Sequence, residues 1–439
     1  MWLYNPQNVK ATYHANGNIL QIRFELENGE EAIEGRRINM VRTEMEIRLP
    51  SKMNASDIHK DHLALITVLS VNPFVTKQLY MELEVSQEFA ERLQIGCTYD
   101  LKFASKDGKP YNSTHGRPCL AFSGGVDSTA ALMLMPKSTV CVWLDRPDFE
   151  KRTLYNKTAA RYTMQFSQKN NYETYEIYCD VEHLVSPVGF PVDLASGITA
   201  IALASLTNGN SIAYGMVMEA AYRTGHTKFR DYPRSRHYNT WNQAFAAAGI
   251  PLFLPVGGIS EVGTSKIVLD SKFNGKARSC IRGEWPEQCN NCWKCFRKTM
   301  VDNRILSNKV QNDEMKIWMN VREVKYKLSA WPVSHENVLA WALKNPKLEG
   351  EIASSLLSRL EGSTRNLELL AKWFPPSIEL IPVEFRGEFV KRVGTYIETM
   401  SDIEIAESES LDISEWLGSE TGLNARAEFD DVLESLAQD

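Results

Sequence analysis

The sequence predicts an α/β protein in which a parallel β-sheet carries helices on both faces. From Cys119 to Leu132 the chain reads as a short apolar strand, a glycine turn and a helix, and apolar strands alternate with helices over residues 116–300. This alternation is typical of parallel sheets covered on both faces. Residues 1–115 show strand patterns that predict a β-rich α+β domain, and residues 301–400 show the spacing of an α-helical domain.

The composition is that of a globular protein of about two to three domains, with 439 residues, 43% hydrophobic and 24% charged. No run of about 18 apolar residues is present, so we expect no membrane span. The first residues lack a basic segment followed by an apolar run, so we expect a cytoplasmic protein without a secretory signal. The formal net charge is −6, but residues 402–439 hold 12 acidic residues and one basic residue, which leaves +5 on the rest. We therefore expect a mildly basic body suited to an anionic nucleotide and a solvated, partly helical acidic tail over residues 401–439.

In the N-terminal region, apolar and polar residues alternate over three segments, as in half-buried strands. These segments are residues 20–26, 45–49 and 79–85. Ser86 is expected to cap a short helix after the third segment. Residues 62–71 form an apolar run that fits either a strand or a buried helix, and residues 106–117 are rich in turn formers and predict a linker.

The central region contains the expected parallel strands, which are residues 120–122, 139–144, 175–178, 211–214 and 251–256. Residues 197–206 read as a buried helix between two of them. Because ligands of such sheets bind beyond the carboxyl ends of the strands, we expect one cleft at that edge. It would collect the glycine turn, Asp145, Asp180 and the stretch after Tyr214.

The glycine turn is the candidate nucleotide site. Its two adjacent glycines allow another group to approach the main chain closely, and we expect Asp127 or Ser128 to cap the following helix. The free N–H groups at a helix N-terminus bind phosphate, and nearby hydroxyls can donate to the same oxygens. A Walker A motif is absent, because no lysine followed by serine or threonine comes after the second glycine. The predicted ATP-binding residues are Phe122, Ser123, Gly124, Gly125, Val126, Asp127, Ser128, Thr129 and Asp145.

The hexapeptide Ser-Gly-Gly-Val-Asp-Ser at residues 123–128 resembles the PP-loop of the N-type ATP pyrophosphatases. The resemblance implies an adenine nucleotide alpha hydrolase-like fold whose loop holds the ATP phosphates. It also implies that ATP adenylates a carboxylate or amide oxygen and that pyrophosphate leaves, with Mg²⁺ bridging phosphate oxygens near Asp127. We expect Ser123 and Asp127 to be catalytic, together with Lys266, which would neutralise charge developing on the α-phosphate.

Four of the eight cysteines lie close together, at Cys280, Cys289, Cys292 and Cys295. In a chain without a secretory signal, clustered cysteines indicate a metal rather than disulfides. Four thiolates suit a structural zinc ion, and a [4Fe–4S] cluster accepts the same ligands. We favour zinc, and we expect it to brace the structure because a closed site leaves no position for water.

The stretch between Tyr222 and Tyr238 is strongly basic and contains several aromatic rings. At the mouth of a nucleotide cleft, such a loop could stack a flat heterocycle and hold a carboxylate or phosphate. The predicted substrate-binding residues are Asp231, Tyr232, Arg234 and Arg236. The alternatives are a solvated basic loop and a contact with nucleic acid.

A PP-loop followed about 150 residues later by Ser-Cys-x8-Cys-x2-Cys-x2-Cys and an arginine resembles the 7-cyano-7-deazaguanine synthases of queuosine biosynthesis. That family carries a zinc site of this form. Residues 263–268 resemble its Thr-Lys-x-x-Ile-Val stretch, and residues 231–236 resemble its Gly-Tyr-Pro-Asp-Cys-Arg substrate loop. The resemblance covers residues 118–300 and implies adenylation of a carboxylate such as 7-carboxy-7-deazaguanine, followed by attack of an amine. Arg234 and Ser235 stand where the family has Asp-Cys, so a cation replaces the acid that would read a guanine-like edge.

Three functions remain open from the sequence. The first is an ATP-dependent ligase that forms an amide or nitrile, such as an antiviral-defence relative of the synthases. Its acceptor would be a nucleobase, a nucleic acid or the chain end of a protein encoded nearby. A homodimer is compatible with this function. The second is a tRNA thiolation enzyme, which needs a redox cysteine near the loop, with Cys119 and Cys179 as candidates. The third is a non-catalytic subunit that keeps the fold and the zinc site as an interaction platform.

Overall fold

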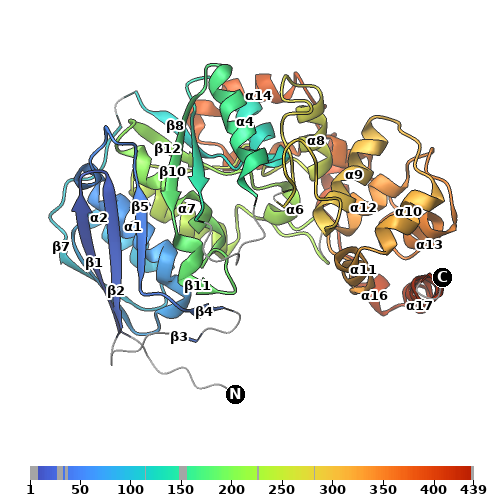
Figure 1. Ribbon diagram of the computed structural model, residues 1–439, viewed down its shortest axis with the longest axis horizontal. Coiled ribbons are helices and arrows are strands. Elements are labelled where there is room, and N and C mark those ends of the chain that lie inside the picture. The colour runs from blue at the N-terminus through green and yellow to red at the C-terminus, as the bar shows by residue number, and fades with distance from the viewer. Residues whose placement is uncertain are drawn as a thin grey trace.

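The computed structural model describes residues 8–26, 33–34, 38–113, 115–147, 156–224, 227–280 and 282–436. The protein is a mixed α/β structure with a large, mostly parallel central sheet and a helical C-terminal region (Figure 1). The 10-stranded sheet has the order β13-β12-β8-β9-β10-β5-β2-β1-β6-β7. Its strands are β1 (Asn8–Asn16), β2 (Ile19–Leu26), β5 (Glu44–Arg48), β6 (Gln78–Glu84), β7 (Asp100–Ser105), β8 (Arg117–Ala121), β9 (Val140–Asp145), β10 (Glu173–Cys179), β12 (Gly209–Ala213) and β13 (Leu252–Phe253). A 3-stranded sheet contains β3 (Ile33–Glu34), β4 (Asn39–Met40) and β11 (Val185–Ser186).

The half of the sheet from β13 to β10 is parallel, as the sequence predicted. Successive side chains of a strand face opposite sides, and here both sides are buried: Val140 and Val142 join one core, whereas Leu120 and Cys141 join another. Helices therefore cover both faces. The helices of this α/β body are α1 (Lys60–Val71), α2 (Gln87–Gly96), α3 (Val126–Leu134), α4 (Lys157–Lys169), α5 (Ile198–Ala204), α6 (Met218–Ala221), α7 (Arg236–Ala247) and α8 (Glu261–Leu269).

The N-terminal strands continue the same sheet. Strand β10 pairs antiparallel with β5, through Tyr178 opposite Arg48 and Cys179 opposite Ile47. Strands β5, β2 and β1 are antiparallel, whereas β1, β6 and β7 are parallel to one another. The apolar run at residues 62–71 belongs to helix α1, and this resolves the choice between strand and helix. Strands β1 and β7 were not predicted from the sequence.

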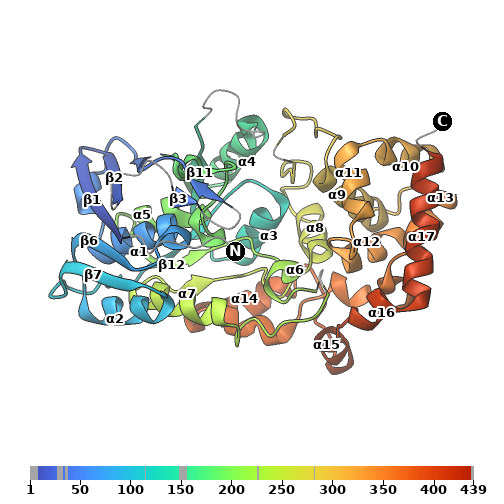
Figure 2. The same cartoon turned by 90° about the horizontal axis from the view of Figure 1, so that it is seen from below.

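The C-terminal region is helical, as expected, but it divides between two places. Most of its helices lie together at the right of Figure 1, whereas α14 lies with the central elements in Figure 2. Phe389 and Val393 of α14 share a buried core with Leu132 of α3 and Phe253 of β13. The helices are α9 (Trp293–Ile305), α10 (Asn312–Met319), α11 (Arg322–Ser329), α12 (Glu336–Leu343), α13 (Glu351–Ser358), α14 (Arg386–Val393), α15 (Asp402–Glu409), α16 (Ser414–Gly418) and α17 (Glu420–Ser435).

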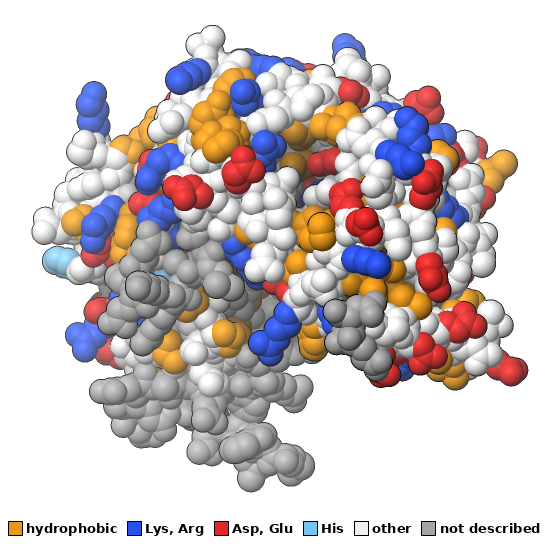
Figure 3. Space-filling view, turned by 45° about the vertical axis from the view of Figure 1, so that its right-hand side comes forward, with side chains coloured by type: hydrophobic (Ala, Val, Ile, Leu, Met, Phe, Trp, Pro, Cys, Tyr) orange, Lys and Arg blue, Asp and Glu red, His pale blue; other side chains and the backbone are white. Residues whose placement is uncertain are grey.

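The acidic tail is helical and mostly exposed, as expected, but it also packs against the rest of the protein. Helices α15 to α17 are ordered, and Phe429 and Leu433 of α17 are buried in the main core. The buried guanidinium of Arg359 pairs with Asp430 at 2.9 Å, and Lys325 donates to the carbonyl of Leu433 at 3.0 Å. The spacing of the apolar residues places them on one side of the helix and leaves most acidic side chains exposed; Figure 3 shows many acidic side chains in the lower right of its view. In the described part of the chain, no helix has the length and apolar character needed to cross a membrane.

Candidate functional site

The glycine turn leaves strand β8 and enters helix α3. Gly124 has φ of +73°, a left-handed conformation that glycine adopts without strain. A Cβ at this position would lie 3.0 Å from backbone atoms of Ala160 in α4, so the turn packs directly against that helix. The N-cap of α3 is Gly125, and the expected capping by Asp127 or Ser128 is wrong because both residues lie in the first helical turn.

Ser123 and Ser128 form hydrogen bonds within the turn instead of capping the helix. The hydroxyls of Ser123 and Ser128 are 2.9 Å apart, and the amide of Gly125 donates to Ser123 Oγ at 3.3 Å. Ser128 Oγ donates to the carbonyl of Gly125 at 3.2 Å. The amides of the first three residues of α3 have no acceptor within the helix. They therefore remain available to an anion at this end of the helix.

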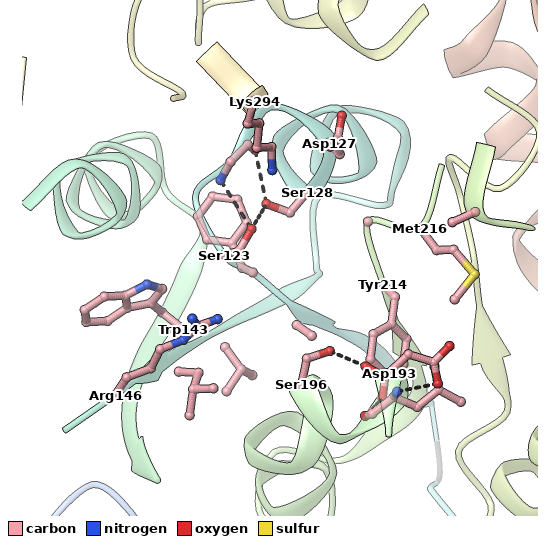
Figure 4. A pocket seen from close by; sticks show the side chains of 18 residues that line it. Ser123, Asp127, Ser128, Trp143, Arg146, Asp193, Ser196, Tyr214, Met216 and Lys294 are labelled. Atoms are coloured by element: carbon pink, nitrogen blue, oxygen red, sulfur yellow. Dashed lines mark hydrogen bonds between the residues drawn. The ribbon is translucent and has the colours of Figure 1, made fainter. Parts of the chain in front are cut away.

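A cavity of about 390 Å³ opens in front of the turn, at the carboxyl ends of the parallel strands (Figure 4). This volume lies within the range of about 300–1,000 Å³ that is usual for small-molecule sites. Ser123, Ser128 and Lys294 mark one end of the cavity, and Asp193 and Tyr214 mark the other. The lining residues are Ala121, Phe122, Ser123, Gly125, Asp127, Ser128, Val142, Trp143, Leu144, Arg146, Asp193, Leu194, Ser196, Tyr214, Gly215, Met216, Ala220 and Lys294.

Gly215 allows the two halves of the site to approach each other. It follows β12, and a Cβ there would lie 2.8 Å from the amide nitrogen of Ser128. Any side chain would therefore separate the segment after β12 from the first turn of α3. The absence of a side chain allows this close packing of the two backbone segments.

The structure brings only part of the predicted nucleotide site together. Gly124, Val126, Thr129, Asp145 and Lys266 are absent from the lining of the cavity, although the first three lie in the turn or directly after it. Asp145 is the last residue of β9, and its carboxylate accepts from Lys157 at 2.7 Å. Lys266 lies on α8. Asp180, also expected in the cleft, instead pairs with Arg42 at 2.9 Å.

The four predicted substrate residues also lie outside the cavity lining. Tyr232 is buried, and Asp231 and Arg236 are exposed. Arg234 is exposed and pairs with Glu379 at 2.5 Å. The structure therefore does not place the basic stretch directly against the turn, because its charged side chains point to solvent or to neighbouring helices.

The end of the cavity opposite the turn contains Asp193, which the sequence analysis missed. Asp193 accepts a hydrogen bond from the amide of Leu194 at 2.9 Å and lies 3.2 Å from Nε2 of His237. The ring of His237 also contacts the hydroxyl of Tyr232 at 3.1 Å, which connects the basic stretch indirectly to the cavity. Burial alone would raise the pKa of Asp193, but His237 and backbone donors hold it below its usual value. Asp193 therefore offers an anionic acceptor to N–H groups of a ligand.

Behind the turn, Asp127 belongs to a buried charge network. Its Oδ1 accepts from Thr264 Oγ1 at 2.8 Å and from Lys298 Nζ at 3.1 Å. Lys298 also lies 3.7 Å from Glu261, and the guanidinium of Arg297 makes two hydrogen bonds to Glu261 at 2.9 and 2.8 Å. Burial would raise the pKa of Glu261, but Lys298 and Arg297 lower it well below its usual value. The network therefore stays charged and fixes Asp127 from behind.

The four clustered cysteines converge in an arrangement that could hold a metal ion. Their Sγ atoms all lie within 4.8 Å of one another, and those of Cys289 and Cys295 are 3.7 Å apart. A tetrahedral zinc ion with Zn–S distances of about 2.3 Å needs sulfurs about 3.8 Å apart, so the geometry fits zinc. Amides of Arg282 and Cys295 donate to the sulfurs of Cys280 and Cys292, both at 3.4 Å, as expected for thiolates bound to a metal.

The functional residues that the sequence analysis did not assign come from segments far from the turn. Gly215 is a glycine directly after a predicted strand, which is a signal that could have been used. Asp193 and Lys298 carry no such signal, because neither belongs to a motif. Lys294 lies between Cys292 and Cys295 in the sequence, and its place in the cavity lining depends on the path of α9.

Comparison with known proteins gives one match. A sequence model of a family of unknown function, DUF6395, matches residues 240–412. This stretch includes the four cysteines, Lys294 and Lys298, and it begins after the glycine turn and Asp193. No curated protein and no solved structure matches the chain.

Proposed function

We propose that this protein is an ATP-dependent C–N ligase, which adenylates a carboxylate, releases pyrophosphate and joins the activated acyl group to an amine. One observation carries the proposal. The turn at residues 123–128 forms one end of a cavity of about 390 Å³, at the sheet edge where α/β proteins bind ligands. The resemblance of this turn to a PP-loop supports ATP as the ligand.

The turn would hold the phosphates. The amides at the start of α3, the hydroxyls of Ser123 and Ser128 and the ammonium of Lys294 are donors that converge on one end of the cavity. These groups would stabilise the charge that develops on the leaving pyrophosphate. Asp127 is the carboxylate of this end, and because Mg²⁺ prefers oxygen ligands, it is the residue that would hold a metal ion bound to the phosphates.

The other end would hold the acyl substrate. Asp193 would accept hydrogen bonds from the N–H groups of a guanine-like edge. It would take the role of the acidic residue that the synthases have at the position of Arg234. Met216 also lines the cavity and would offer apolar surface to a flat ring. A 7-carboxy-7-deazaguanine-like molecule matches this arrangement, with N–H donors at one edge and a carboxylate that can face the phosphate end.

In the proposed reaction, a carboxylate oxygen of the substrate attacks the α-phosphorus of ATP. The bond from that phosphorus to the bridging oxygen of pyrophosphate breaks. An amine then attacks the acyl carbon and AMP leaves, which gives an amide. A second adenylation, on the amide oxygen, would convert a primary amide to a nitrile. The cysteine site has four thiolate ligands and no open position, so it would brace the fold rather than take part in these steps.

The structure gives less support to the thiolation alternative. That reaction needs an accessible cysteine near the turn, and no cysteine is among the residues described as lining the cavity. Cys119 and Cys179 are buried, and burial raises the pKa of the Cys119 thiol to about 11. A protonated, inaccessible thiol is a poor nucleophile.

The test is an assay with ATP labelled at the α-phosphate, 7-carboxy-7-deazaguanine and ammonia. We expect AMP and pyrophosphate to form only when the carboxylate is present. The Ser123→Ala and Asp127→Asn variants should lose this activity, whereas Asp270→Asn, which removes an exposed carboxylate after α8, should keep it. Formation of ADP, or AMP formation that does not depend on any carboxylate offered, would contradict the proposal.

A further inference from the structure

Helix α9 connects the cysteine site to the nucleotide site. Its N-cap is Cys292, whose Sγ accepts from the amide of Cys295 in the first turn. Lys294 lies between these two cysteines and lines the cavity beside Ser123 and Ser128 (Figure 4). One helical turn therefore carries two of the four thiols and a cation of the phosphate end.

The next turn of α9 carries Lys298, which is only 3% exposed. Burial of an ammonium group is costly unless it is paired, and Lys298 pairs with Asp127 at 3.1 Å and Glu261 at 3.7 Å. The bidentate bond between Arg297 and Glu261 adds a second connection between α9 and α8. The position of α9 therefore determines where Asp127 and its partners lie.

The segment before α9 contacts its neighbours through a few side chains, among them Trp285, which stacks on Tyr162. Between α8 and α9 the described residues form neither helix nor strand, although this stretch contains Cys280 and Cys289. Four thiolates on one ion would join this segment to the first turn of α9. Without the ion, the sulfurs have no bond to one another, because all are free thiols. Phe296 packs against Trp293 in the same first turn and against Trp318 of α10, so these contacts hold the helix in place without the ion.

We propose that metal binding at the four cysteines and nucleotide binding at the turn are thermodynamically coupled through α9, with Lys298 as a positioning residue and Lys294 as a phosphate ligand. The inference rests on the proposed function only in taking ATP as the ligand of the turn. Metal would hold the first turn of α9 so that Lys294 faces the phosphates and Lys298 holds Asp127. Because coupling between two sites is reciprocal, bound ATP must in turn slow the loss of the metal.

The experiment measures both directions on the full chain loaded with zinc. The first measurement is the rate of zinc transfer to a chromogenic chelator, with and without ATP. The second is the affinity for ATP before and after removal of zinc. We expect ATP to slow zinc release, and removal of zinc to weaken ATP binding by roughly 10- to 100-fold, the range for a lost hydrogen bond to a charged group. Direct binding of zinc by ATP would accelerate release, so slower release reports the coupling.

Variants separate the coupling from general loss of structure. Lys298→Met keeps all four cysteines, so it should retain zinc but lose both the high ATP affinity and the protection of zinc by ATP. Lys294→Gln removes the charge that α9 places in the cavity. If Lys298→Met does not fold, Lys294→Gln should likewise retain zinc but lose the high ATP affinity and the protection of zinc by ATP. Lys272→Met, which removes an exposed lysine after α8, is the matched control and should behave as the wild type.

The outcomes distinguish this inference from the proposed function. If the wild type binds ATP equally well with and without zinc, and ATP does not change zinc release, the coupling is wrong and the ligase proposal stands. If the zinc-loaded wild type does not bind ATP, the proposed function fails and the coupling fails with it. If Lys298→Met and Lys294→Gln keep the wild-type protection of zinc, α9 does not transmit the effect.

Discussion

Alanine substitutions at Gly124 and Gly125 should have different effects although the two residues are adjacent. At Gly124 the left-handed φ costs an alanine about 1–2 kcal/mol, and the new Cβ would meet backbone atoms of Ala160 at 3.0 Å. Because backbone atoms of a packed helix cannot move aside as a flexible side chain can, we expect a total loss of about 2–4 kcal/mol in the free energy of unfolding. At Gly125 the φ is −77°, and the nearest atom to a new Cβ is Ser123 Oγ at 3.4 Å. The free energy of unfolding should therefore change by no more than about 1 kcal/mol there.

The assay is urea unfolding followed by circular dichroism, with the midpoint as the readout. Gly275→Ala is the control for backbone strain alone, because Gly275 has φ of +68° and no atom within 4 Å of its Cβ position. We expect the order of midpoints Gly125→Ala, Gly275→Ala and then Gly124→Ala, from highest to lowest. ATP affinity should fall in Gly125→Ala without a loss of stability, because the methyl group occupies the cavity wall. Equal midpoints for Gly124→Ala and Gly275→Ala would refute the packing of the turn against α4.

Three further predictions concern a lysine, a buried acid and the cysteines. Lys266→Met should leave ATP affinity within about twofold of the wild type, whereas Lys294→Met should reduce it by about tenfold or more. Titration calorimetry measures both affinities. A larger loss in Lys266→Met than in Lys294→Met would support Lys266 as the phosphate-binding lysine, as the sequence predicted. Burial and the neighbouring Glu261 raise the pKa of Glu219 to about 7; the folded protein then keeps a proton that the unfolded chain releases at its ordinary pKa of 4.5. Stability should thus fall as pH rises from about 4.5 to 7, and Glu219→Gln should remove this slope and gain up to about 3 kcal/mol at pH 8 in urea unfolding. Cys289→Ser should lower the zinc content measured by atomic emission well below the wild-type value, while the thiol control Cys97→Ser should not; equal zinc content in both would count against the four-cysteine site.

The sequence was informative where local pattern and tertiary structure agree. The parallel strands of the central region were predictable because both faces are buried and the strands read as apolar runs. The convergence of the cysteines was predictable because metal ligands share a short spacing. The strands β1 and β7 were missed because their apolar residues are few, and because both pair with β6, which lies elsewhere in the chain.

The candidate site was predictable only on the side formed by the turn. Ser123, Asp127 and Ser128 belong to one motif, so their place together follows from the sequence. Asp193 and Lys298 reach the site through long-range packing, which no local pattern encodes. The basic stretch was misjudged for the same reason, because Arg234 finds its carboxylate partner at Glu379, 145 residues further along the chain.

The antiparallel pairing of β10 with β5 has a consequence for solubility. An unpaired strand edge exposes a row of amide and carbonyl groups that can recruit another chain. Here β5 covers the carboxyl end of the edge of β10, at Tyr178 and Cys179, and the opposite end of the sheet is the very short strand β13. A chain shortened to begin after residue 105 would expose the edge of β10, and we expect such a protein to aggregate even though every residue that lines the cavity at the glycine turn and all four clustered cysteines would still be present.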